Sequence, residues 1–74
     1  MSKTFGVGIV GAGTIGRVHA AELEGVDGAR LVAVAEPHER AGRGLADAHG
    51  AEWHPNLGEL VARDDVEVVV LCTP

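Results

Sequence analysis

Three glycines and one acidic residue have the types and the spacing to bind a ligand through the protein backbone. The glycines are Gly11, Gly13 and Gly16, and Glu36 follows 20 residues after the last of them. Glycine permits a tight turn before a helix, and its missing Cβ lets the backbone approach a bulky anion. The N–H groups at the start of a helix attract that anion, because the helix dipole makes their surroundings positive. The pattern predicts a diphosphate site at the start of the first helix.

Each glycine has its own task in this interpretation. Gly11 permits the turn from strand to helix, Gly13 admits the pyrophosphate, and Gly16 lets the helix pack closely on the strand. The N–H groups of Thr14 and Ile15 are expected to face the phosphates. The glycine spacing alone is a weak signal, because glycines that serve only a turn can show it. The interpretation therefore depends on a strand before the glycines and a helix after them, and the sequence predicts both.

Glu36 ends the second apolar strand, where dinucleotide-binding domains carry an acidic residue. Its carboxylate can accept hydrogen bonds from both hydroxyls of the adenosine ribose and would repel a 2′-phosphate, so it favours NAD over NADP. Arg40, one helical turn later, could reach a 2′-phosphate, and NADP stays open as the alternative cofactor. We favour an exposed helix arginine at that position. The alternative for Glu36 is a solvated strand end.

The elements that must position these residues alternate along the chain. Apolar, β-branched runs predict strands, and apolar residues at helical spacing predict helices. Strands are expected at residues 5–10, 31–35, 51–54 and 66–72, and helices at 14 to about 24, at 38 to about 49 and after an Asn56 cap. The order β-α-β-α-β-α-β predicts an α/β fold with a Rossmann-like parallel sheet and right-handed crossovers. Residues 1–74 would form the first half of a doubly wound dinucleotide-binding domain.

The spacing of the apolar residues also predicts which side of each helix is buried. The expected buried residues are Ile15, Val18 and Leu23 in the first helix, Ala41, Leu45 and Ala48 in the second, and Leu57, Leu60 and Val61 in the third. His19 falls on the same face of the first helix and, without a carboxylate or nucleophile partner, is expected to be structural. Cys72 has no evident cation to lower its pKa, so we favour a buried strand-end residue over a reactive thiol. Trp53 is expected to cover the sheet edge, with stacking on adenine as the alternative.

Composition excludes several classes of partner and site. The chain has 74 residues, a formal net charge of −5 and six basic residues that form no run, which argues against nucleic-acid binding. Its longest apolar run, residues 68–72, is too short to span a bilayer, so no membrane partner is expected. With one cysteine there is no disulfide, and no Cys/His cluster has the spacing of a metal site. A reducing, cytoplasmic location fits this composition best.

The chain resembles the N-terminal domain of the Gfo/Idh/MocA oxidoreductases. The matching stretches are VGIVGAGTIGRVHAAEL, LVAVAEPHERA and WHPNLGELVARDDVEVVVLCTP, and the closing segment is more particular to the family than the glycine motif. The resemblance implies NAD(P) binding within an oxidoreductase that acts on a CH–OH group of a sugar, polyol or inositol. It also implies that the loop Cys72-Thr73-Pro74 passes beside the dinucleotide, with Thr73 and Pro74 on the nicotinamide side. The alternative for this loop is a plain strand exit.

The same resemblance implies that the catalytic residues lie beyond residue 74. They include a lysine in a Glu-Lys-Pro-like motif and a downstream Asp/His pair, so no catalytic residue is assigned here. The substrate-binding domain is expected to be absent from this chain as well. The alternative is a non-catalytic dinucleotide-binding or interaction module, and a flavin site is a third hypothesis. The strand at residues 66–72 would then present an apolar edge for a homo-oligomer or another chain.

Overall fold

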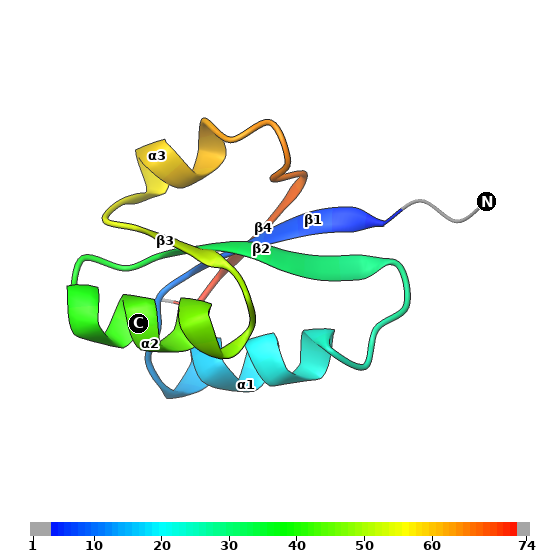
Figure 1. The fold of residues 1–74 in the computed structure, drawn as a ribbon, viewed down its shortest axis with the longest axis horizontal. Coiled ribbons are helices and arrows are strands. Elements are labelled where there is room, and N and C mark those ends of the chain that lie inside the picture. Colours follow the sequence, from blue (N-terminus) through cyan, green and yellow to red (C-terminus); the bar gives the residue numbers. More distant parts are fainter. Residues whose placement is uncertain (1–3, 73–74) are drawn as a thin grey trace.

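The seven expected elements form in the expected order. A computed structural model describes residues 4–72 and contains a parallel sheet of four strands in the order β3-β2-β1-β4 (Figure 1). The strands are β1 (Phe5–Val10), β2 (Ala29–Ala35), β3 (Glu52–His54) and β4 (Val68–Leu71). The helices are α1 (Thr14–Leu23), α2 (Glu39–Ala48) and α3 (Leu57–Val61). The predicted α/β fold with a Rossmann-like sheet is confirmed.

The two faces of the sheet are covered unequally. Helices α1 and α2 lie on one face, and the short helix α3 lies on the other (Figure 1). The core under α1 and α2 includes Ile9, Val34 and Leu45, whereas the core under α3 consists of Ala33, Ala35 and Leu60. Strand β1 pairs with β2 on one side and β4 on the other, which explains why its sequence is an unbroken apolar run. This arrangement puts the glycine turn after β1 near the middle of the sheet.

The predicted buried face of α1 is wrong for its two large β-branched residues. Ile15 and Val18 are 56% and 49% exposed, whereas Gly16 and Ala20 face the core. The reason is the short distance between α1 and the turn before it, because a Cβ added to Gly16 would overlap the carbonyl oxygen of Gly11. Only the smallest residues fit such an interface. The spacing of the large apolar residues therefore predicts the wrong buried face for this helix.

In the other two helices the predicted burial of Leu45 and Leu60 is confirmed, and the prediction is wrong for the remaining residues, which are exposed. In α2 the buried residues are Gly42, Leu45 and Ala46, and in α3 only Leu60 is buried. A Cβ added to Gly42 would overlap the Trp53 side chain, so this helix too rests on the sheet through a glycine. The predicted Asn56 cap is confirmed, since its Oδ1 accepts a hydrogen bond from the Glu59 amide at 2.9 Å.

His19 does not occupy the apolar position that the sequence predicts for it. Its side chain is 47% exposed, and its Nδ1 lies 3.6 Å from a carboxylate oxygen of Glu22. The exposure of His19 has the same cause as that of Ile15 and Val18, because α1 is oriented about its axis with Gly16 and Ala20 towards the core. Among residues 4–72, no helix is long and apolar enough to cross a membrane.

Two glycines of α2 should respond in opposite ways to alanine. Gly42→Ala should lower the free energy of unfolding by about 1–3 kcal/mol, because the added methyl overlaps Trp53. Gly44→Ala should raise it by about 1 kcal/mol, since nothing lies within 4 Å of the added Cβ and alanine favours the helix. Urea denaturation of the two variants and the wild type measures both changes. Equal effects of the two substitutions would contradict this packing.

Candidate functional site

The turn between β1 and α1 is built around a glycine that no other residue replaces without strain. Gly11 has a φ of 104°, in the region that L side chains rarely adopt. Its amide donates a hydrogen bond of 2.9 Å to the carbonyl oxygen of Ala35, at the end of β2. The turn is therefore fixed to the neighbouring strand, and the first residues of α1 start from a defined position.

The first amides of α1 have no acceptor within the helix. The first helical hydrogen bond runs from the Arg17 amide to the Gly13 carbonyl at 3.0 Å, which leaves the N–H groups of Thr14 and Ile15 outside the helical ladder. Gly13 contributes no side-chain cap, and no acidic residue stands in the first turn. Positive potential from these amides is therefore available to an anion.

A cleft of about 450 Å³ lies directly against these amides. It brings together three parts of the chain: the glycine turn with the start of α1, the end of β2, and the end of β4. The residues that line it are Gly11, Gly13, Thr14, Ile15, Glu36, Leu71 and Cys72. Parallel sheets bind ligands at the carboxyl ends of their strands, and this cleft has that location.

Glu36 stands in the cleft with both carboxylate oxygens hydrogen-bonded to the backbone. Oε1 accepts a bond of 2.9 Å from the Ala12 amide in the glycine turn, and Oε2 accepts one of 2.8 Å from the His38 amide before α2. An ionised carboxylate offers about four acceptor sites, so two remain for hydroxyl donors of a ligand. The sequence predicts the acid at this place but gives no signal for its bond to Ala12.

The two backbone hydrogen bonds also keep Glu36 ionised. The amides of His38 and then Ala12 stabilise the charged form and hold the pKa of the Glu36 carboxyl below its ordinary value of 4.5. Partial burial acts in the opposite direction but is the smaller effect. At neutral pH the cleft therefore presents a negative charge at the end of β2 and positive amide dipoles at α1.

Cys72 lines the cleft directly after β4. It is buried, and its amide donates a hydrogen bond of 2.8 Å to the carbonyl oxygen of Val10. Burial raises the pKa of the Cys72 thiol, which disfavours the reactive thiolate. Thr73 and Pro74, which the resemblance places on the nicotinamide side, lie outside the described residues.

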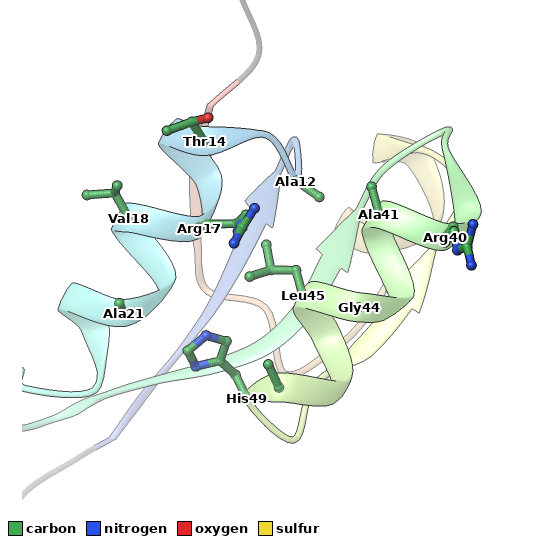
Figure 2. Close-up of a pocket in the computed structure, with 11 residues that line it drawn as sticks. Ala12, Thr14, Arg17, Val18, Ala21, Arg40, Ala41, Gly44, Leu45 and His49 are labelled. Carbon is green, nitrogen blue, oxygen red and sulfur yellow. The ribbon is translucent and has the colours of Figure 1, made fainter.

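A larger hollow of about 800 Å³ lies between α1 and α2 (Figure 2). Arg17 extends from α1 towards this space, and Arg40 lines it from the first turn of α2. The walls are mostly small side chains along the sides of two helices. We assign the candidate site to the smaller cleft, because it combines the amides of α1 with the carboxylate of Glu36. Arg40 does not line that cleft.

Sequence reasoning also missed an ionic cluster far from the cleft. Arg63, after α3, lies 2.7 Å from a carboxylate oxygen of Glu52 in β3 and 2.7 Å from one of Asp65. The cluster joins the end of α3 to the sheet edge and takes no part in the candidate site. Within the described part of the chain, no group of three or more His, Cys, Asp or Glu residues could hold a metal ion.

Residues 5–74 match the family described as the oxidoreductase family with an NAD-binding Rossmann fold, Gfo/Idh/MocA. The chain belongs to this family. The resemblance seen in the glycine turn and the closing segment is thereby confirmed. Because the match covers nearly the whole chain, the glycine turn and Glu36 occur in the setting of a nicotinamide-dinucleotide domain.

Curated relatives include inositol dehydrogenases, and the chain spans about a fifth of their length. It is 42% identical over 71 residues to the inositol 2-dehydrogenase of Rhizobium meliloti, covering 96% of this chain and 21% of the relative. It is 43% identical over 74 residues to the inositol 2-dehydrogenase of Rubrobacter xylanophilus, covering 99% of this chain and 21% of the relative. The region that this chain shares with these enzymes is the NAD-binding Rossmann domain.

Solved structures repeat the same arrangement. GenD2 from gentamicin A biosynthesis, solved in complex with NAD, is 39% identical and superposes with a TM-score of 0.94, covering 100% of this chain and 21% of that one. The myo-inositol dehydrogenase of Lactobacillus casei, solved with NAD(H) and myo-inositol, is 26% identical with a TM-score of 0.87, covering 95% and 22%. Both neighbours contain a nicotinamide dinucleotide.

The lowered pKa of Glu36 predicts a pH-dependent contribution to stability. Because its folded-state pKa is depressed, the contribution is present above pH 4.5 and is lost as pH falls through the folded value. The wild type should therefore lose more stability than Glu36→Gln as the pH falls below 4.5. Urea denaturation at a series of pH values measures the difference.

A charge-matched control separates this local effect from a change in net charge. Asp27→Asn removes one carboxylate from the exposed loop between α1 and β2. If Glu36→Gln and Asp27→Asn give the same pH profile, the hydrogen bonds from the Ala12 and His38 amides do not stabilise the ionised form.

Proposed function

We propose that this chain binds NAD in the cleft beside α1, as the cofactor-binding part of an oxidoreductase. The observation that carries the proposal is that the positive amide dipoles of α1 and the negative carboxylate of Glu36 line the same cleft. The amides of Thr14 and Ile15 suit a diphosphate, and the Glu36 carboxylate suits a ribose with two free hydroxyls. Family membership supports the same cofactor.

The residues present fit this cofactor by their chemistry and space. The position of a Cβ at Gly13 has nothing within 4 Å, so the backbone there is open to a bulky phosphate. In the proposal, Gly11, Gly13 and Gly16 shape the phosphate turn. The loop Cys72-Thr73-Pro74 passes beside the dinucleotide, with Thr73 and Pro74 on the nicotinamide side. NAD, when bound, would act as the hydride acceptor, and the residues of this chain would bind and orient it.

The substrate of the whole protein is proposed to carry a CH–OH group on an inositol, sugar or other polyol. Support comes from the inositol 2-dehydrogenases among the curated relatives. Catalytic acid and base groups would lie in the region of the whole protein that corresponds to the unmatched part of these relatives. A cytoplasmic location belongs to the same proposal, because a single cysteine fits a reducing compartment.

Alanine at two glycines should separate binding from folding. Gly13→Ala should leave the unfolding midpoint nearly unchanged, since its φ of −78° suits alanine and the added Cβ meets nothing within 4 Å. It should weaken NAD binding by about tenfold or more, because the methyl stands where the phosphate must approach. Isothermal titration with NAD measures the affinity, and thermal unfolding monitors the fold.

Gly16→Ala and Glu36→Ala are the matched variants for this experiment. Gly16→Ala should destabilise the fold itself, because its methyl overlaps the Gly11 carbonyl. Glu36→Ala should reduce the preference for NAD over NADP, since the charge that repels a 2′-phosphate is gone. No measurable binding of NAD by the folded wild type would refute the proposed function.

A second proposal concerns an interaction at the edge of the sheet. In the part of the chain that the structure describes, β4 is an edge strand, and Val68, Val69 and Leu71 are exposed along it. Exposed apolar edges pair with other strands. We propose that β4 pairs with β4 of a second copy of this chain, which is the form that a non-catalytic interaction module would use.

Charge on this edge should abolish the pairing. Sedimentation velocity should show concentration-dependent association of the wild type and a monomer for Val69→Lys, because lysine blocks edge pairing. Val26→Lys is the control, since Val26 is 50% exposed but lies in the loop between α1 and β2. The edge proposal fails if the wild type stays monomeric at every concentration, or if the two lysine variants behave alike.

A further inference from the structure

The backbone of Glu36 is held from the neighbouring strand β3. Its amide donates a hydrogen bond of 2.9 Å to the carbonyl oxygen of His54. Its own carbonyl oxygen accepts a hydrogen bond of 2.8 Å from Nε1 of Trp53. The first is an ordinary continuation of the sheet, but the second is a side-chain bond that the sheet does not require.

The indole ring that makes this bond is itself fixed in place. Trp53 is partly buried and packs against the core under α1 and α2. Gly42 of α2 leaves the room that the ring needs, because a Cβ there would overlap it. The guanidinium of Arg43 lies over the ring, 4.8 Å from its centroid. An aromatic ring held in this way can place its N–H within narrow limits.

The position of the Glu36 backbone decides where its carboxylate stands. The side chain reaches from this backbone to the Ala12 amide in the glycine turn and to the His38 amide before α2. Trp53 is not among the residues that line the cleft. Its hydrogen bond to the Glu36 carbonyl oxygen is a direct link from the ring to a residue of the cleft.

We propose that Trp53 is a positioning residue for dinucleotide binding, whose indole N–H fixes the Glu36 backbone and so aims the carboxylate at the adenosine ribose. The inference rests on the proposed function, because it assigns Glu36 to that ribose. The ligand class it concerns is a dinucleotide with a free 2′-hydroxyl. Loss of the N–H would let the carboxylate shift while the fold and the diphosphate amides remain.

A double-mutant cycle tests this route of action. Trp53→Phe keeps an aromatic ring and removes the N–H, and Glu36→Gln alters the group on which Trp53 is proposed to act. Trp53→Phe should weaken NAD binding by about two- to tenfold, the range expected for one hydrogen bond. In the Glu36→Gln background the same substitution should change the affinity by less than about twofold, because interacting residues are not additive.

Arg43→Gln is the matched control for the ring environment. It removes the cation over the ring but keeps the hydrogen bond from Trp53 to Glu36. Its NAD affinity should stay within about twofold of the wild type, since exposed cation–π contacts are weak. A purely structural role for Trp53 would instead give equal losses of affinity in both backgrounds and a similar loss in Arg43→Gln.

The wild type provides a readout that needs no variant. Trp53 is the only tryptophan of the 74 residues, so its indole N–H gives a single resonance in a nitrogen–proton correlation spectrum. NAD should shift this resonance more than inorganic pyrophosphate, which can occupy the α1 amides but has no ribose. An unmoved indole resonance at NAD saturation, or equal effects of Trp53→Phe in both backgrounds, overturns the inference and leaves NAD binding intact. Absence of NAD binding by the wild type overturns both.

Discussion

The hydrogen bond between the Glu36 carboxylate and the Ala12 amide is the constraint on which the cleft depends. It joins the end of β2 to the glycine turn after β1, over a separation of 24 residues. With the second bond to the His38 amide, one side chain fixes three segments relative to one another. The group proposed to read the ligand is thus already ordered without it, which lowers the entropic cost of binding.

The helices contact the sheet largely through glycine and alanine, and this limits how well the sequence predicts which helix residues are buried. Strand β1 at Phe5–Val10 and the start of α1 at Thr14 agree with the prediction, because an apolar run ending in glycines is unambiguous. The buried faces of the helices were predicted only in part: Leu45 and Leu60 are buried as expected, whereas Ile15 and Val18 are exposed. The helix contacts use Gly16 and Gly42, and a hydropathy pattern ranks such residues below Ile15 or Val18.

The residues of the candidate site could be predicted from the sequence where a residue type is required by the turn or strand end in which it lies. The three glycines and Glu36 follow from spacing, since each serves a turn or a strand end close to it in the chain. The bonds from Ala12 and Trp53 to Glu36 join residues 24 and 17 positions apart. Such contacts depend on how strands are ordered in the sheet, and neither residue type carries a signal for them.

The unequal cover of the sheet has a consequence for motion. Helix α3 rests on the sheet mainly through Leu60, whereas the opposite layer shares a larger core that includes Ile9, Val34 and Leu45. Segments with few buried contacts open locally at lower free energy than the rest of a protein. Transient detachment of α3, with rapid deuterium uptake between β3 and β4, can therefore occur while the opposite layer keeps the glycine turn in shape.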